Sequence, residues 1–369
     1  KHQAAAMKFE NASVFEMGLT FSLLIYLLVF PFHLYAQSSV QQERLTFVRL
    51  TGEQYRNSIR DIFGESIEVR GDAVSAGVRE AGLTALGDRR LTLSSSEVES
   101  FEVLALDIAS QVLEPSRRTT LIPCEPDNQN SVDDECASEF ISSVGLHLFR
   151  RPLAQDEIEG FKSMASAATN SLGSFYVGLQ AALVGMMVSP DFLFRTERSS
   201  PNPEAPGLRQ LDAWSIASRL SFFLWNTTPS VSLLKAAESG ELLFEEGLNK
   251  QVDRMMSSPR VEDGLRAFFS DMLAFDRFNT LDIDPTLYPK FTKSVEDEAR
   301  EQTLRTITYH LLDQESDYRD IFDSRKTFLT PALAALYGVP IPIRQEMGGR
   351  VPWVPYEFPD GHVRTGLLG

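Results

Sequence analysis

The chain has 369 residues, and its 51 Asp and Glu side chains against 35 Lys and Arg give a net charge of −16 at pH 7. This length is enough for two or three domains with hydrophobic cores. The acidic excess is spread along the chain without a basic face. Nucleic acids and anionic lipid surfaces are therefore excluded as expected partners, because both bind clustered Lys and Arg.

An uncharged apolar run covers residues 18–36 and ends at Ala36. A short charged start, an apolar middle and a small residue at the end are typical of a secretory signal peptide. Pro31 and His33 interrupt the run, whereas a membrane-spanning helix needs about 20 mostly apolar residues. We expect residues 1–36 to be a leader and cleaved signal peptide, with an uncleaved membrane anchor as the alternative. The protein is then exported, to the periplasm or the cell surface.

Helical patterns dominate the sequence that follows. Thr51 and Ser94 each begin a capping box, in which a hydroxyl and a Gln or Glu three residues later satisfy the first amides of a helix. Apolar residues at helical spacing follow both positions, whereas the glycine-rich stretch 64–93 has neither a helix nor a strand period. These elements predict an N-terminal helix–loop–helix module over residues 44–113.

The chain has two cysteines, Cys124 and Cys136, which close a short polar loop. In an exported protein this arrangement indicates a disulfide, and a metal or redox pair is the weaker alternative because the spacing is not Cys-x-x-Cys. The acidic run 133–135 is expected to cap the next helix. The strongly apolar stretch 175–188 predicts a core helix. The disulfide loop and its helices form a second predicted module, residues 124–198.

A proline-rich stretch over residues 199–207 is the best candidate for a linker. Beyond it, Asp212 is a suitable N-cap for a helix over 214–225 that is apolar on nearly all sides, so this helix is expected to be central. Further helical patterns complete a module over 208–338, and the prolines of 339–369 predict extended chain. The predicted fold is mainly helical, with multi-helix modules, long loops and a proline-rich extended C-terminal segment.

Arg219 lies inside the apolar helix of the third module, where an unpaired charge would be very costly. We predict a structural ion pair buried in the core, with Asp191, Asp271 and Glu301 as candidate partners. Arg219, Arg195 and Asp191 are therefore assigned as structural buried charges.

Signatures of nucleotide-binding loops, serine hydrolases and zinc proteases are absent from the sequence. His147, His310 and His362 are far apart in the chain, and structural roles are favoured for the first two over metal ligation. The sequence identifies no catalytic, cofactor-binding or metal-ligating residue.

Two carboxylate pairs are candidates for metal binding or acid–base chemistry. Asp282 and Asp284 could help to hold calcium, but a turn or capping role is favoured. Glu298 and Glu301 lie one helical turn apart and could act as a general acid and base, but a solvated helix face is favoured.

Six short stretches stand out in chain order, and they are residues 50–64, 149–153, 189–195, 217–225, 327–338 and 364–368. Together they resemble planctomycete-type secreted domains of unknown function, which are also common in myxobacteria. In planctomycetes those domains often share chains with c-type cytochrome modules, so the resemblance implies a periplasmic or surface cytochrome, or another envelope protein, as partner. The last domain of the family continues beyond this motif, which implies a C-terminally truncated chain.

We therefore expect an exported envelope protein of unknown molecular activity, a scaffold or interaction component associated with cytochrome-type systems. The sequence has no Cys-x-x-Cys-His motif, so haem is expected only through a partner or a separate module. One alternative is a secreted hydrolase or oxidoreductase acting on an extracellular polymer, which two converging carboxylates of raised pKa would favour. Another is a carbohydrate-binding component, for which Trp353 and Tyr356 are the candidate exposed aromatic residues.

Overall fold

The computed structural model describes residues 44–71, 79–87, 93–202, 205–280, 283–284, 286–342 and 353–364. The predicted signal peptide, Asp282 and most of the last family motif lie outside these residues. The internal contacts divide the chain into two units. One comprises Lys1–Arg44 and Ser199–Gln210, and the other comprises Leu45–Arg198 and Leu211–Gly369. All the helices of the described residues belong to the second unit, which holds every site discussed below.

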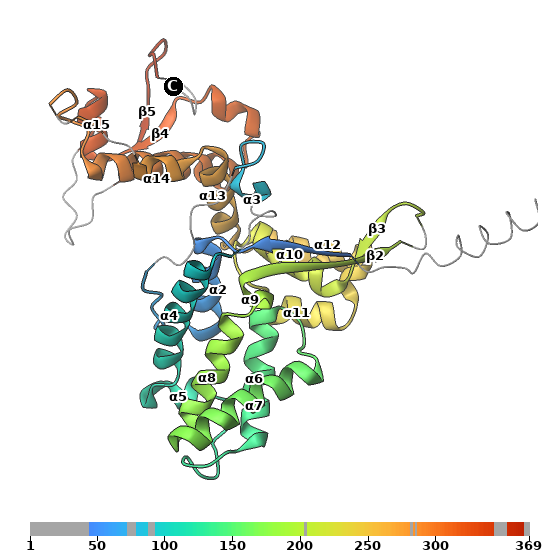
Figure 1. Ribbon diagram of the computed structural model, residues 1–369. Helices are drawn as coiled ribbons and strands as arrows, with labels where there is room; N and C mark the ends of the chain where they lie inside the picture. The colour runs from blue at the N-terminus through green and yellow to red at the C-terminus, as the bar shows by residue number, and fades with distance from the viewer. Residues whose placement is uncertain are drawn as a thin grey trace, which may run out of the picture. The chain divides into compact units, whose positions relative to one another are not determined.

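The prediction of a mainly helical fold is confirmed, as Figure 1 shows. The N-terminal half contains α2 (Gly52–Phe63), α3 (Thr84–Gly87), α4 (Ser95–Val112), α5 (Pro115–Leu121), α6 (Asp134–Phe149), α7 (Gln155–Leu172), α8 (Phe175–Met187) and α9 (Pro190–Leu193). The C-terminal half contains α10 (Ala213–Leu224), α11 (Val231–Glu238), α12 (Glu245–Met256), α13 (Val261–Met272), α14 (Lys293–Thr308) and α15 (Pro331–Tyr337). Single turns of other helix types are η2 (Glu241–Leu243), η3 (Phe275–Thr280), η4 (Tyr309–Asp313) and η5 (Tyr318–Phe322).

The predicted helix starts are confirmed by their hydrogen bonds. Thr51 Oγ1 accepts from the Gln54 amide (3.1 Å), and Gln54 Oε1 accepts from the Thr51 amide (3.2 Å). Ser94 begins α4 with the same reciprocal pair. Asp212 Oδ1 accepts from the Ser215 amide (2.6 Å) at the start of α10. Each cap satisfies amides that have no partner inside the helix, so the local sequence sets where these helices begin.

The first hydrophobic core surrounds α8, the predicted core helix, which packs on α4, α6 and α7. Its buried residues extend from Leu50 to Phe222. The predicted modules 44–113 and 124–198 therefore share one core. Smaller clusters form around α10, α11 and α12 and around α14, β4 (Lys326–Leu329) and α15. In the described part of the chain, no helix is long and apolar enough to cross a membrane.

Two small sheets complete the fold. Strands β1 (Arg44–Arg49), β2 (Phe194–Pro201) and β3 (Arg209–Leu211) form one sheet in that order. The prediction of a linker over 199–207 is partly wrong, because β2 continues to Pro201. The Asn202 amide donates to the Leu208 carbonyl oxygen (2.9 Å). A proline-rich composition does not predict such a hydrogen bond between two backbone segments. In the C-terminal segment, β5 (Val354–Glu357) is extended as predicted and pairs antiparallel with β4.

Helices α7 and α8 approach each other closely at Gly178. A Cβ atom at this position would lie 2.1 Å from Thr169 Oγ1 and 2.5 Å from the carbonyl oxygen of Ala165. Thr169 Oγ1 donates to that same carbonyl oxygen (2.9 Å), so neither neighbour is free to move aside. Glycine is therefore required for this contact, because a densely packed interior has little space to relax.

Gly178→Ala is expected to destabilise the fold by about 1–3 kcal/mol, the usual cost of overpacking a core. Gly160→Ala in α7 is the matched control, because nothing lies within 4 Å of its added Cβ. The control should be neutral or stabilising by up to about 1 kcal/mol, since alanine is the better helix former. Urea unfolding of both variants measures the difference, and equal midpoints would contradict the close-packing account.

Candidate functional site

The predicted disulfide between Cys124 and Cys136 is present and joins the polar loop to the first turn of α6. Asp133 caps that helix as predicted, with its Oδ1 accepting from the Cys136 amide (2.9 Å). The described residues include no free cysteine. The disulfide therefore fixes the start of α6, the helix that ends at the arginine described next.

Arg150, directly after α6, is a buried arginine that sequence reasoning missed. It is only 3 % exposed, and its backbone takes a left-handed conformation with φ of 59°. Its guanidinium donates to the carbonyl oxygens of Phe192 (3.2 Å) and Phe194 (2.6 Å) and also contacts that of Asp191. These carbonyls belong to the end of α9 and the start of β2. The cation therefore satisfies a helix C-terminus, where positive charge is favoured.

The environment of Arg150 changes its acidity. Its pKa is lowered to about 9, chiefly by burial and also by the charge of Arg195, while the charge of Asp191 opposes the change. Arg195 is half-buried, with its guanidinium carbon 5.3 Å from the centre of the Phe222 ring. The sequence feature that could have pointed to Arg150 is its place directly after the apolar end of α6.

Arg151 explains the position of Asp191. Its two Nη atoms donate to the two carboxylate oxygens of Glu157, both at 2.8 Å, and Nη2 also donates to Asp191 Oδ1 (3.0 Å). Hydrogen bonding to Glu157 raises the pKa of Arg151, and the same bond lowers the pKa of Glu157. Asp191 is half-buried and belongs to this network, so its structural assignment fits, with Arg151 as its ion-pair partner.

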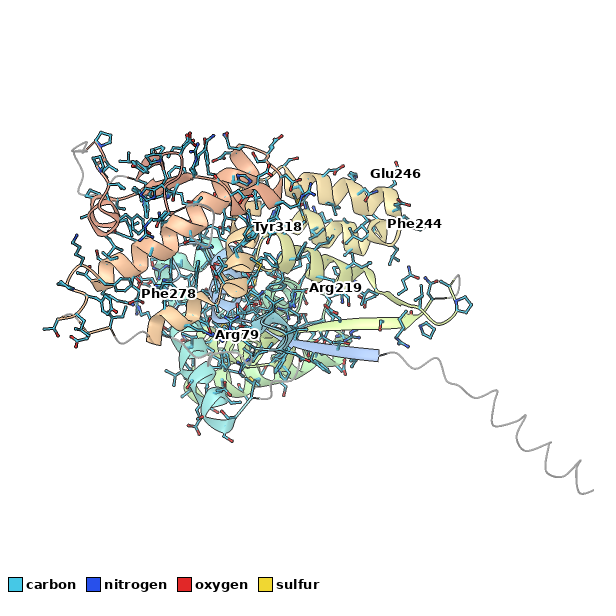
Figure 2. All side chains as sticks on the ribbon, turned by 90° about the horizontal axis from the view of Figure 1, so that it is seen from above. Arg79, Arg219, Phe244, Glu246, Phe278 and Tyr318 are labelled. Atoms are coloured by element: carbon cyan, nitrogen blue, oxygen red, sulfur yellow. A yellow bond between two sulfur atoms is a disulfide. The ribbon has the colours of Figure 1, made fainter. Side chains whose placement is uncertain are left out.

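The prediction that Arg219 is buried is wrong. Its side chain is 52 % exposed, and it pairs with Glu197, which is only 7 % exposed. Arg219 Nε lies 3.1 Å from Glu197 Oε1, and the bond to this carboxylate raises the pKa of Arg219. None of the candidate partners Asp191, Asp271 and Glu301 is used. The reason is that β2, which was not predicted, brings Glu197 beside α10 (Figure 2 labels Arg219).

The pair Glu298 and Glu301 is structural. Glu301 accepts from Arg305 (3.0 Å) and from Arg266, and Glu298 accepts from the Thr330 hydroxyl. The favoured interpretation, a solvated helix face, is wrong, because α13 and the start of α15 supply partners for both carboxylates. Both carboxylates therefore have structural partners.

The three histidines of the described residues lie in separate places. His147 is half-buried, and burial lowers its pKa. His310 Nε2 lies 2.8 Å from the carbonyl oxygen of Asp317, and the His362 ring stacks on that of Phe358 at 4.8 Å. Across the described ranges, no group of three or more His, Cys, Asp or Glu residues is arranged to hold a metal ion.

A cleft of about 340 Å³ opens beside the first turn of α2. The end of α10, helix α13 and the segment 79–85 form its other walls. Phe223 is 69 % exposed here, and Phe268 also exposes its ring, whereas Gly264 and Ala267 are small. We call this the Phe223 cleft, and its lining residues are Thr51, Glu53, Gln54, Arg79, Leu83, Thr84, Ala85, Phe222, Phe223, Asn226, Gly264, Ala267, Phe268, Ser270, Asp271 and Asp276.

Hydrogen bonds hold the walls of the cleft together. Asn57 Nδ2 in α2 donates to the carbonyl oxygen of Asn226 (3.1 Å), just after α10. A Cβ atom on Gly264 would lie 2.3 Å from the carbonyl oxygen of Leu224, so α13 lies directly against the end of α10. The cleft is therefore a fixed feature of the second unit, built from segments far apart in the sequence.

Arg79, labelled in Figure 2, ties its own loop to α13. Its Nη1 donates to the carbonyl oxygen of Asp271 (2.7 Å) and to its Oδ1 (3.1 Å), and Nη2 contacts the Asp276 carboxylate. The Asp271 carboxylate also accepts from the amides of Thr84 (2.9 Å) and Ala85 (3.1 Å). Both aspartates are thus occupied in anchoring the loop.

Glu53 is the remaining carboxylate of the cleft. Its side chain is solvent-exposed, and desolvation by the surrounding cleft walls raises its pKa above the ordinary 4.5; the charge of Arg56 opposes the rise, and that of Asp263 adds to it. A carboxyl group with a raised pKa can act as a general acid. A two-carboxylate hydrolase needs a second free carboxyl group nearby, and Arg79 holds the two aspartates that line this cleft.

Comparison with known families identifies two domains. Residues 136–197 match PSD5, a protein of unknown function (DUF1595), and residues 211–339 match PSD4, a protein of unknown function (DUF1592). The chain carries two planctomycete-type secreted domains. PSD5 covers most of α6 to β2, including Arg150, and PSD4 runs from the end of β3 to just beyond α15. Comparisons with curated proteins and with solved structures gave no match. These families and the disulfide suggest export. The function of both families is unknown, so the matches do not point to any particular activity.

Arg150→Met is expected to destabilise the protein by about 2–4 kcal/mol, because buried carbonyls at the end of α9 lose their donor. Arg150→Lys should rescue little of this loss, since an ammonium cannot span the carbonyls as the guanidinium fork does. Arg319→Met is the matched control, with a side chain that is 86 % exposed. Its effect should stay within about 0.5 kcal/mol. Similar unfolding midpoints for Arg150→Met and the control would overturn the assigned role.

The raised pKa of Glu53 predicts that the stability of the folded protein depends on pH. Because desolvation in the cleft raises its pKa above 4.5, the folded state binds the proton more tightly than the unfolded chain, by a margin that the solvent exposure of the side chain keeps small. The contribution of this group to the free energy of unfolding therefore falls as the pH rises from 4.5 through the raised pKa of Glu53. It stays reduced at higher pH. Glu53→Gln should stabilise the protein more at pH 7 than at pH 4, relative to the wild type. Asp263→Asn should shrink this difference. Urea unfolding at both pH values is the test, and a pH-independent effect of Glu53→Gln would count against it.

Proposed function

We propose that this chain is a non-catalytic interaction component of the cell envelope, and that the Phe223 cleft is its binding face. The observation that supports this most is the pair of exposed rings, Phe223 and Phe268, beside small residues in a fixed cleft. Exposed aromatic side chains set in a pocket are typical anchors of protein interfaces. Exposure of the two rings to water is unfavourable, so a partner that covers them binds with a gain in free energy.

The charges around the cleft support binding over catalysis. Asp271 and Asp276 are held by Arg79, so their carboxylates stabilise the cleft wall. The net charge of −16 favours a partner with a basic face and a salt-sensitive association rate. The resemblance to domains that share chains with c-type cytochromes makes such a cytochrome the first candidate partner. Haem then belongs to the partner and not to this chain.

A hydrolase is the second candidate, and Glu53 is the observation that favours it. Its raised pKa and its position in the cleft suit a general acid acting on an extracellular polymer. A carbohydrate-binding role has less support. Trp353 and Tyr356 are half-buried and pack against the α14–α15 cluster, and Arg305 lies 5.2 Å from the Trp353 ring centre.

Affinity purification of the tagged full chain from its native envelope tests the proposal, with mass spectrometry and haem absorbance as readouts. The double variant Phe223→Ser, Phe268→Ser should reduce recovery of a stoichiometric cytochrome by roughly 30-fold or more, as expected for loss of about 2 kcal/mol at an interface anchor. Val103→Ser is the control, because Val103 on α4 is also 69 % exposed. Equal recovery with both variants would reject the cleft as the binding face.

Glu53→Gln separates the two candidate functions. An interaction component should retain its partner with this variant, whereas a hydrolase should lose turnover of its polymer. Polymer cleavage by the wild type that Glu53→Gln abolishes would replace the first proposal with the second.

A further inference from the structure

A second and much smaller cavity lies beside Arg150, and it shares no lining residue with the Phe223 cleft. Its volume is about 20 Å³, and Arg150, Arg151, Thr196, Arg198 and Ser218 are among its lining residues. A cavity of this size holds a single water-sized particle and excludes multi-atom anions such as phosphate from its interior.

Two hydroxyl groups of this cavity have no hydrogen-bond partner among the described residues. They are Ser218 Oγ and Thr196 Oγ1, and both atoms are buried. Ser218 is 4 % exposed and sits on α10, and Thr196 sits on β2. A buried hydroxyl without a partner is costly, and native proteins rarely leave one unsatisfied. These two groups therefore point to a particle that accepts hydrogen bonds between them.

The charge of the lining identifies the kind of particle. Three arginines, Arg150, Arg151 and Arg198, face one aspartate, Asp212. The Asp212 carboxylate is occupied as the N-cap of α10, where it accepts from the Ser215 amide (2.6 Å). Arg151 is paired with Glu157 and Asp191, whereas Arg150 and Arg198 have no carboxylate hydrogen-bonded to them among the described residues. Two such cations beside one aspartate favour a small anion over a neutral particle.

The arginines differ in what they have left to donate. Arg150 is directed at backbone carbonyls, and Arg151 is bound to Glu157 and Asp191. The Arg198 amide donates to Ser215 Oγ (2.8 Å), and its guanidinium makes no hydrogen bond within the described ranges. Arg198 therefore brings unused charged donors to the same cavity as the two unused hydroxyls.

We propose that this cavity binds one chloride ion, held by the hydroxyls of Ser218 and Thr196 and by the guanidinium of Arg198. The ion supplies the counter-charge of a region in which Arg150 has no carboxylate hydrogen-bonded to it among the described residues. The site links β2 to α10 and so stabilises the junction between the segments matched by PSD5 and PSD4. It does not depend on the function of the Phe223 cleft.

Thermal unfolding of the full chain in sodium chloride and in sodium gluconate at equal ionic strength tests the proposal. The Tm of the wild type should be higher in chloride and should rise with the logarithm of chloride concentration. Ser218→Ala should abolish the chloride-specific shift. Ser221→Ala is the matched control on the same helix, since its hydroxyl bonds to the Thr228 carbonyl oxygen (2.9 Å). The control should lower the Tm in both salts and keep the shift.

Crystals grown in sodium bromide give an independent readout that does not depend on a variant folding. An anomalous difference peak between Ser218, Thr196 and Arg198 is expected. Density for an ordered water with no anomalous signal would overturn the proposal. The same Tm in both salts for the wild type, or a chloride shift retained in Ser218→Ala, would also overturn it.

Discussion

The buried guanidinium of Arg150 is the interaction on which the rest of the described fold depends. It gathers carbonyl oxygens from the end of α9 and the start of β2 onto the end of α6. A charged group is stable in this place because its hydrogen bonds replace those to water, and the left-handed backbone of Arg150 turns it toward those carbonyls. The direction in which β2 leaves the first core is set here, as are the positions of Thr196, Glu197 and Arg198 on that strand.

The position of β2 determines which side chains meet α10 in the C-terminal half of the chain. The strand places Glu197 against Arg219 and brings Thr196 and Arg198 to the cavity beside α10. Phe223 lies in the last turn of α10, where α2 and α13 complete the cleft. The aspartates of that cleft hold a loop, and its aromatic rings remain exposed. Because the aspartates are occupied and the rings are exposed, we propose a binding function for the cleft and not a catalytic one.

The sequence predicted the features that depend on neighbouring residues. Thr51, Ser94 and Asp212 cap their helices as expected, because a cap uses groups within one turn. The disulfide and the apolar α8 also follow from local patterns and composition. Arg219 was misplaced because its partner belongs to a strand with no clear period, and Arg150 was missed because its partners are carbonyls about forty residues away. The Phe223 cleft joins segments near residues 53, 223 and 268. No local sequence pattern predicts that these distant segments lie together.

Photo-crosslinking in the native envelope tests most directly whether the cleft is a binding face. The full chain would carry a photo-reactive phenylalanine analogue in place of Phe223, or in place of Val103 on α4, which is equally exposed. We expect one haem-containing protein to be crosslinked from the Phe223 position and little or nothing from the Val103 position. Equal yields from the two positions, or no crosslinked protein from the Phe223 position, would contradict an interaction role for the cleft.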